Sequence, residues 1–325
     1  MTIRHDALRR TLLGAAAACG AAAVLPLRAQ PATTRFIVAA AAGGATDLLT
    51  RQFAQWLGEE WGRPTVAENR PGAGGVIATQ FVQRAPADGS TLMLGALSHV
   101  ANVGMMDNVQ YDPVKDFTVI AKLVTFGSVL VVHPSVPAED LRQFIAHVKA
   151  NPDKLNWALG ATGTSQHLAG VTLAREAGLK YTMVPYKGGG PAMTDLLSGQ
   201  VQFMIESIPT AIPHIQSRRI RALAVTGSRR SSGLPDVPTI AEAGVPGFDV
   251  ETWFTLIGPA GIPQSFVDGT YQALERIMAR PQVQERLVAL GARPDLQDPA
   301  RSRAFIESEA RRWLPIIREA GIKVG

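Results

Sequence analysis

The chain alternates short apolar runs with helical patterns, and this alternation constrains its fold more than any other feature. Residues 36–40 form a short apolar run, after which Leu49, Phe53, Trp56 and Leu57 repeat at helical spacing. The next strand candidates are residues 65–68 and 91–94. Such alternation predicts an α/β fold with doubly wound parallel sheets, in which ligands bind beyond the carboxyl ends of the strands.

One long β-like stretch, residues 117–132, interrupts the alternation and is a candidate crossover into a second domain. The pattern then restarts, with a helix over 139–150, a strand over 155–159, a helix ending near Gly178, and strands over 181–186 and 201–205. Residues 221–226 and 251–258 are predicted to return the chain to the first domain. We therefore expect two αβ lobes joined by extended crossover strands, a hinged clamshell. The first comprises residues 33–124 and 227–325, and the second comprises residues 125–226.

Two glycine-rich turns, about 120 residues apart, each join a predicted strand to a predicted helix. The first contains Gly43, Gly44, Ala45, Thr46 and Asp47, and the second contains Thr164, Ser165 and His167. The first backbone N–H groups of a helix have no intrahelical partner and carry the positive end of the helix dipole. A carboxylate or phosphate binds there without an arginine. A ligand with anionic groups at both ends could bridge the turns, which indicates a binding protein.

Composition excludes several other classes of protein. The formal net charge is +5, but residues 1–29 hold four arginines against one aspartate, which leaves +2 for the remainder and argues against a nucleic-acid partner. Cys19, the only cysteine, lies in the same segment, so the rest of the chain has no disulfide, thiolate metal site or cysteine nucleophile. The histidines show no zinc-ligand pairing. We expect no metal and no cofactor.

The amino terminus has the pattern of a cleaved export signal over residues 1–29. Arg9 and Arg10 precede an alanine-rich apolar stretch that runs to Leu27 without a charge. Paired arginines followed by two leucines resemble a twin-arginine signal, and the general secretory route stays open as the alternative. The stretch is shorter than the roughly 20 residues that a membrane span needs.

Four motifs occur in an order that resembles the periplasmic receptors of tripartite tricarboxylate transporters, also called Bug receptors. They are ENRPGAGG at 68–75, YDPVKDF at 111–117, PYKG at 185–188, and LPDVPT at 234–239 with EAG at 242–244. The resemblance runs from about Phe36 to about Ile322. It implies a type II periplasmic-binding fold and an unattached receptor in the periplasm. Such a receptor, which we expect to be a monomer, delivers a small organic acid to membrane permease subunits.

The resemblance also implies which residues contact the ligand. In that family the two strand-to-helix turns hold the ligand's carboxylates, largely through backbone amides and hydroxyls. The matching positions here are Gly43, Gly44, Thr46 and Asp47 in the first turn, and Thr164, Ser165 and His167 in the second. Asp47 is expected to cap backbone N–H groups, because its charge repels an anionic ligand. For His167, packing within the helix and contact with the ligand stay open.

Further candidates follow other predicted strands. Ser98 and Tyr186 can supply neutral hydroxyls at strand ends, and Glu206 follows the strand over 201–205. His99 is adjacent to Ser98, and the flexible stem of Lys187 is expected to keep its ammonium group in water.

The chain departs from the family pattern in two places. Ala41 and Ala42 precede the first turn where the family commonly has prolines, so more ordering entropy is expected to be lost on binding. Glu206 stands where the family more often has Asp or Asn. If its longer carboxylate points inward, a ligand that bears an amine, such as an acidic or zwitterionic amino acid, is favoured over a plain dicarboxylate.

Two other functions remain open at this stage. An exported α/β hydrolase could use Ser165 and His167, because a catalytic triad is defined in space, although His167 stands where a nucleophile elbow requires glycine. A sensory module would use the same hinge and docking surfaces to engage a signalling protein rather than a permease.

Overall fold

The computed structural model describes residues 33–186, 188–319 and 321–323. Residues from Thr33 onward form one compact unit. The predicted export signal and Cys19 lie outside the described residues. Within the described part of the chain, no helix combines the length and apolar character needed to cross a membrane.

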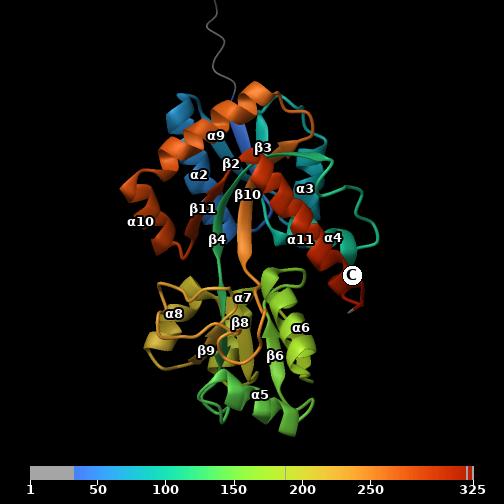
Figure 1. Cartoon of the computed structure of the whole chain (residues 1–325), viewed down its shortest axis with the longest axis vertical. Coiled ribbons are helices and arrows are strands. Elements are labelled where there is room, and N and C mark those ends of the chain that lie inside the picture. The colour runs from blue at the N-terminus through green and yellow to red at the C-terminus, as the bar shows by residue number, and fades with distance from the viewer. Residues whose placement is uncertain (1–32, 187, 320, 324–325) are drawn as a thin grey trace, which may run out of the picture. The chain divides into compact units, whose positions relative to one another are not determined.

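The first sheet is mixed, with strand order β11-β4-β10-β3-β1-β2 (Figure 1). Its strands are β1 (Thr34–Val38), β2 (Thr65–Asn69), β3 (Thr91–Gly95), β4 (Phe117–Phe126), β10 (Thr252–Pro259) and β11 (Arg293–Gln297). β1 runs parallel to β2 and β3, whereas β10 runs antiparallel to β3 and β4. The sheet therefore combines the parallel strands β1, β2 and β3 with the long antiparallel strands β4 and β10, which connect it to the second sheet.

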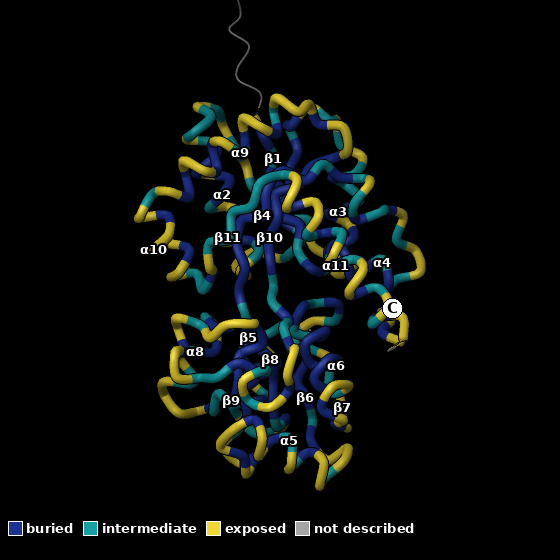
Figure 2. The backbone as a smooth tube through the Cα atoms, viewed as in Figure 1, coloured by how far each residue is buried: buried dark blue, intermediate teal, exposed yellow. Residues whose placement is uncertain are grey.

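Helices cover both faces of this sheet. They are α2 (Ala45–Trp61), α3 (Val76–Gln83), α4 (Leu97–Met105), α9 (Gln264–Met278), α10 (Pro281–Ala289) and α11 (Pro299–Glu319), with a 3-10 turn η1 (Ala73–Gly75) before α3. Phe36 packs on the face covered by α2 and α9, while its neighbour Ile37 packs on the opposite face with α3, α4 and α11. Because both faces are buried, the inner strands β1, β3, β4 and β10 appear in the sequence as mainly apolar runs. Figure 2 shows β1, β4 and β10 mainly in the dark blue of buried residues.

The second sheet has the order β7-β6-β8-β5-β9. Its strands are β5 (Ser128–Val132), β6 (Asn156–Leu159), β7 (Thr182–Pro185), β8 (Phe203–Ser207) and β9 (Arg221–Val225), and its helices are α5 (Leu141–Ala150), α6 (Ser165–Ala177), α7 (Gly189–Leu197) and α8 (Ile208–Gln216). β6 is parallel to β7 and β8, and β5 is antiparallel to β8 and β9. The two sheets with their helices are called the first and second lobes below.

The chain passes between the sheets at the long stretch that the sequence indicates. Only Gly127 separates the end of β4 from the start of β5, so the predicted crossover over 117–132 is confirmed. The return strand predicted at 251–258 is also confirmed, as β10.

The other predicted return strand, 221–226, is wrong. β9 is an edge strand of the second sheet, paired antiparallel with β5. An apolar run specifies that a strand is buried, but it does not specify which sheet the strand joins.

The segment after β9 stays beside the second sheet. Thr239 forms a bridge with Val225, and the N–H of Val250 donates to Thr226 at 2.8 Å. We therefore propose that the second lobe extends to about Val250, rather than to 226 as the sequence suggests.

Two helical glycines, one in each lobe, test how tightly the helices are packed. A Cβ on Gly170 of α6 would lie 2.2 Å from ring atoms of the buried Trp157, whereas a Cβ on Gly269 of α9 would meet nothing within 4 Å. Gly170→Ala is expected to destabilise the protein by about 1–3 kcal/mol through overpacking. Gly269→Ala is expected to stabilise it by up to about 1 kcal/mol through helix propensity. Urea denaturation measures both, and equal effects of the two substitutions would contradict the described packing.

Candidate functional site

The strand registers place the carboxyl ends of the parallel strands of both lobes at one junction. In the first lobe, Gly95 at the end of β3 pairs with Thr255, three residues after the start of β10 at Thr252. In the second lobe, Ser207 at the end of β8 pairs with Ser128, the first residue of β5. Because β10 and β5 both meet the connections between the sheets at these ends, the two sets of strand ends face the same space between the lobes.

Helices begin at this junction from both sides. α2, α3 and α4 follow β1, β2 and β3 in the first lobe, and α6, α7 and α8 follow β6, β7 and β8 in the second. The free N–H groups and the positive dipole ends of these helices therefore point toward the junction. The two glycine-rich turns, which begin α2 and α6, lie on its opposite sides.

Asp47 fixes the first turn from inside. Its Oδ2 accepts the N–H of Gly43 at 3.0 Å, and its Oδ1 accepts from Arg51 Nε at 2.9 Å and Asn69 Nδ2 at 2.8 Å. Burial acts to raise the pKa of Asp47, but these hydrogen bonds outweigh it and the pKa is lowered. Asp47 is only 3% exposed, so it shapes the turn and is not available to a ligand.

The start of α2 keeps donors available beside this anchor. Gly44 is the N-cap residue and makes no side-chain capping bond. Gly44 and Ala45 are exposed and Thr46 is partly exposed, and no acceptor within the described residues takes the N–H groups of these three. Gly43 adopts φ +90°, a conformation that glycine accommodates readily. The first turn can therefore present backbone N–H groups to a carboxylate.

The second turn repeats the same arrangement with a different side chain. Gly163, at φ +82°, donates its N–H to His167 Nδ1 at 3.2 Å. Thr164 caps α6 by accepting the N–H of His167 at 3.3 Å, and its hydroxyl donates to the carbonyl of Ala161 at 2.9 Å. His167 is 2% exposed and packs near Trp157, so it fixes the turn rather than lining an open pocket.

Ser165 connects this turn to the other lobe. Its Oγ is hydrogen bonded to Thr252 Oγ1 at the start of β10 and donates to Gln166 Oε1 at 3.2 Å. The side chain of His167 is directed to Gly163 instead of to Ser165. The serine–histidine pair required by the hydrolase alternative is therefore not formed, and Ser165 lies at the junction between the lobes.

Ser98 lies where the sequence suggests. It is partly exposed in the first turn of α4, and a Cβ on Gly75 would lie 4.0 Å from its Oγ and 3.3 Å from Ala39 Cβ. The end of β1 and the starts of α3 and α4 therefore meet here. The adjacent His99 is a core residue, since it is only 2% exposed. Its Nε2 donates to the carbonyl of Pro113 at 2.8 Å.

Tyr186 and Glu206 already have partners within the second lobe. The Tyr186 hydroxyl donates to Asp195 Oδ2 at 2.7 Å, and burial together with this carboxylate raises the pKa of Tyr186 to about 12. Glu206, at the end of β8, accepts the N–H of Ser207 at 2.7 Å and the Thr210 hydroxyl at 2.9 Å. Because the hydroxyl proton of Tyr186 is donated to Asp195, the Tyr186 oxygen could only accept a hydrogen bond from a ligand.

Sequence reasoning missed the residues that support the turns. Asn69 donates to the carbonyl of Ala40 at 3.0 Å as well as to Asp47, and Thr252 pairs with Ser165. Asn69 is the last residue of β2 and belongs to the motif ENRPGAGG at 68–75. Its position as a polar residue at a strand end could have indicated a role at the site. Thr252 gave no such signal, because its partner lies 87 residues away in the chain.

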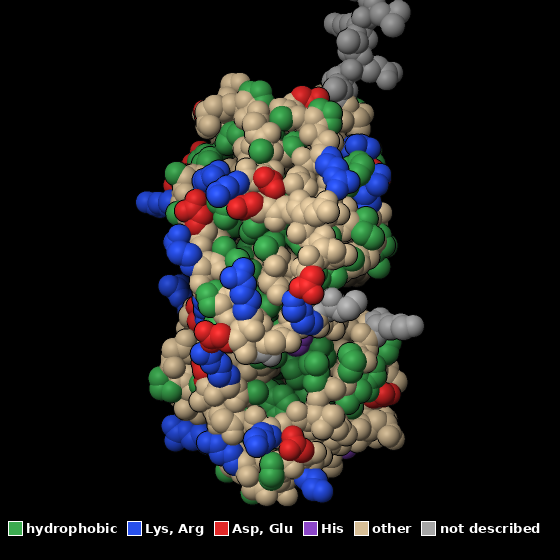
Figure 3. Space-filling model, turned by 90° about the vertical axis from the view of Figure 1, so that its right-hand side faces the viewer, with side chains coloured by type: hydrophobic (Ala, Val, Ile, Leu, Met, Phe, Trp, Pro, Cys, Tyr) green, Lys and Arg blue, Asp and Glu red, His purple; other side chains and the backbone are tan. Residues whose placement is uncertain are grey.

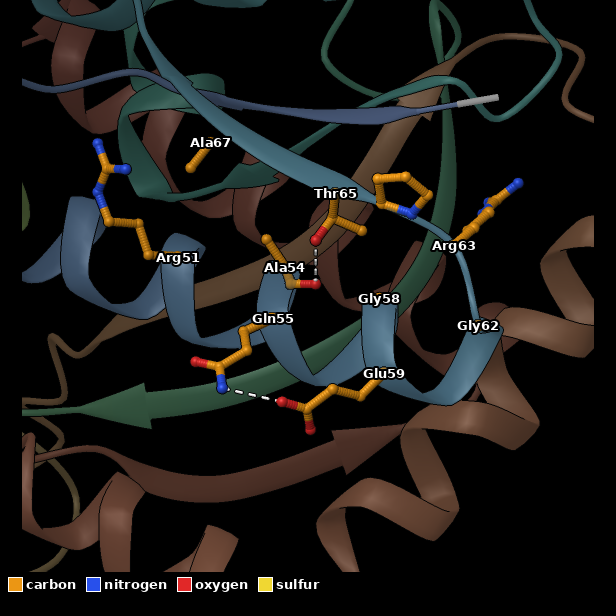
Figure 4. Close-up of a pocket in the computed structure, with 10 residues that line it drawn as sticks. Arg51, Ala54, Gln55, Gly58, Glu59, Gly62, Arg63, Thr65 and Ala67 are labelled. Atoms are coloured by element: carbon orange, nitrogen blue, oxygen red, sulfur yellow. Dashed lines mark hydrogen bonds between the residues drawn. The ribbon is translucent and has the colours of Figure 1, made fainter. Parts of the chain in front are cut away.

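Several cavities among the described residues lie away from the turns, and two of them have the larger volumes. One of about 580 Å³ runs along α2 and β2, beside Arg51, Gln55, Glu59, Arg63 and Thr65 (Figure 4). Another of about 590 Å³ lies beside the connection between the lobes and is lined by parts of α8, α10 and β11.

No cluster of three or more His, Cys, Asp or Glu that could hold a metal occurs within the described ranges. On the face drawn in Figure 3, basic and acidic side chains are interspersed over both lobes.

Comparisons with known proteins agree on one family. Residues 49–322 match TctC, the tripartite tricarboxylate transporter family receptor. Protein BugT of Bordetella pertussis is 36% identical over 311 residues, which cover 95% of this chain and 95% of that protein. A Cupriavidus necator protein described as a UPF0065 protein in the gbd 5′ region is 31% identical and covers 99% of both chains.

Solved structures support the same assignment. R. palustris Rpa4515 with adipate has a TM-score of 0.82 at 33% identity and covers 90% of this chain and 99% of that one. MatC from Rhodopseudomonas palustris with bound malate has a TM-score of 0.78 at 34% identity, with coverage of 88% and 99%. The periplasmic binding protein BugD has a TM-score of 0.78 at 32% identity, with coverage of 90% and 98%. The predicted α/β periplasmic-binding fold is confirmed.

The buried His167 makes the second turn sensitive to acid. Burial lowers its pKa from an ordinary 6.5 to about 4, so between these values the unfolded chain binds a proton that the folded chain does not. Its contribution to stability is complete above pH 6.5 and is lost as the pH falls toward 4. From pH 7.5 to 5.0 we expect a loss of about 2 kcal/mol from this residue.

Urea denaturation of wild type and His167→Gln at both pH values measures this loss. His99, whose pKa burial also lowers to about 4, contributes with the same sign and is unchanged in the variant. The variant should therefore lose less stability than wild type. Parallel pH dependence in the two proteins would show that His167 is not held neutral.

Proposed function

The chain belongs to the tripartite tricarboxylate transporter receptor family, and we propose that it binds a small carboxylic acid between its lobes and delivers it to a membrane permease. Members of this family are substrate-binding receptors rather than enzymes, so the prediction that the chain is not an enzyme is confirmed. Periplasmic solute binding is the shared role of the family.

The observation that carries the proposal is the pair of turns on opposite sides of one junction. Gly43 and Gly163 each donate an N–H to a side chain four residues later, which leaves the following helix starts directed at the junction. Each start can receive one carboxylate through backbone N–H groups. A dicarboxylic acid carries two anionic groups, so one molecule can engage both lobes at once and hold them together.

The ligands in related structures support this substrate class. Adipate and malate, named in the structures of two relatives, are both dicarboxylic acids. Hydrogen bonds to a charged group contribute roughly 1.5–3 kcal/mol each, and association costs several kcal/mol in lost freedom. A few such bonds to each carboxylate give dissociation constants of roughly micromolar size.

Delivery and location complete the proposal. The predicted export signal would place the chain in the periplasm, where it would act as a monomer. Pull-down from membranes with and without the dicarboxylate should capture permease subunits. Capture of a signalling protein in their place would contradict the delivery step.

Calorimetric titration with succinate, malate and adipate tests ligand binding. Ser165→Ala removes a hydroxyl at the start of α6 whose proton, donated to Gln166 at 3.2 Å, can turn to a ligand carboxylate, and should weaken binding about tenfold, the value of one charge-assisted hydrogen bond. Thr252→Val removes only the partner of Ser165 in the other lobe and is the matched control. It should weaken binding less than Ser165→Ala does. No measurable binding of any dicarboxylate by wild type would overturn the proposed function.

A further inference from the structure

Glu206 places a carboxylate among the helix starts of the second lobe. It is the fourth residue of β8, on the sheet face covered by α7 and α8, and only 9% exposed. Its Oε1 accepts the N–H of Ser207, the N-cap residue of α8, at 2.7 Å and the Thr210 hydroxyl at 2.9 Å. The carboxylate therefore already accepts hydrogen bonds from two donors at the start of α8.

The same carboxylate also lies against the start of α7. A Cβ on Gly189, the first residue of α7, would lie 3.0 Å from Glu206 Oε2. A larger residue at this position would therefore press on the carboxylate and require it to shift by a few tenths of an ångström. Glu206 is thus a fixed negative charge beside two helix starts that would otherwise attract a ligand anion.

Closely packed glycines lie between the Glu206 carboxylate and the second turn. A Cβ on Gly160, which follows β6, would lie 3.1 Å from the Cα of Gly189, and the N–H of Gly188 donates to the carbonyl of Gly160 at 2.7 Å. The α6 turn and the α7 start are therefore in direct backbone contact. A ligand carboxylate held at the start of α6 would lie close to the Glu206 carboxylate.

The charges of the second lobe are consequently unequal at its three helix starts. The start of α6 is capped by the neutral residues Thr164 and His167, because burial keeps His167 uncharged at neutral pH. The starts of α7 and α8 are compensated by Glu206. One ligand carboxylate can be received at α6, and a positively charged group is favoured beside it.

We propose that Glu206 is a specificity residue that selects carboxylic acids bearing an ammonium group over plain dicarboxylates of the same length. This inference rests on the proposed function, since it concerns the same site between the lobes. The ligand places one carboxylate at the start of α2 and one at the start of α6, and directs its ammonium group toward Glu206.

Aspartate and succinate test the proposal, because they share a four-carbon dicarboxylate skeleton and differ by one ammonium group. Calorimetry gives the ratio of their dissociation constants in wild type and in Glu206→Gln. Wild type should bind aspartate at least tenfold more tightly than succinate. In Glu206→Gln the preference should fall by tenfold or more, with aspartate binding weakened and succinate binding unchanged or strengthened.

Glu139→Gln is the matched control for loss of a negative charge. Glu139 lies just before α5 in the same lobe and pairs with Arg221 at its surface. Its substitution should leave the ratio unchanged. Glu206→Asp keeps the charge on a shorter side chain and should give an intermediate ratio, which preserves the test if Glu206→Gln fails to fold.

A further variant addresses the chain's own ammonium group at Lys187, which lies outside the described residues. If Lys187→Met reproduced the effect of Glu206→Gln, the carboxylate would serve that lysine and the inference would be overturned. An unchanged ratio in Glu206→Gln would overturn it too, as would a wild-type preference for succinate. Failure of wild type to bind either acid, or malate or adipate, would instead count against the proposed function.

Discussion

A hydrogen bond from a glycine N–H to a side chain four residues later shapes both sides of the site. Gly43 uses the charged Asp47 and Gly163 uses the neutral ring of His167. In each case the acceptor is the third residue of the helix, so the bond ties the turn to the helix it precedes. The following N–H groups are thereby held in place, so in the proposed function a ligand would meet a preorganised set of donors.

The two lobes are joined at the ends of β4 and β10, which are neighbouring strands of the first sheet. β4 and β10 are paired along most of their length, and both end or begin at the junction. An ion pair between Arg175 of α6 and Glu319 of α11, 3.3 Å apart, also spans the lobes. Both of its side chains are more than half exposed, so the pair contributes about 1 kcal/mol or less. The paired strands β4 and β10, rather than this ion pair, are therefore the main connection between the lobes.

Local features of the fold were predictable, because each is encoded within a few residues. The strand before the first turn and the helix after it lie within a few residues of their predicted limits, and Gly178 ends α6 in a left-handed conformation. Sheet membership was less accessible, as β9 shows. Its apolar pattern fits an edge strand of the second sheet as well as a return to the first, and only pairing with β5 distinguishes them.

The sequence by itself determined the two turns, since each glycine and its acceptor lie only four residues apart. It also determined that the family is one of receptors, through motifs in a fixed order. Tertiary structure alone decided that the turns oppose each other, that Ser165 meets Thr252, and that Glu206 lies against Gly189. These relations join residues far apart in the chain, so they depend on how the lobes fold and cross rather than on local propensity.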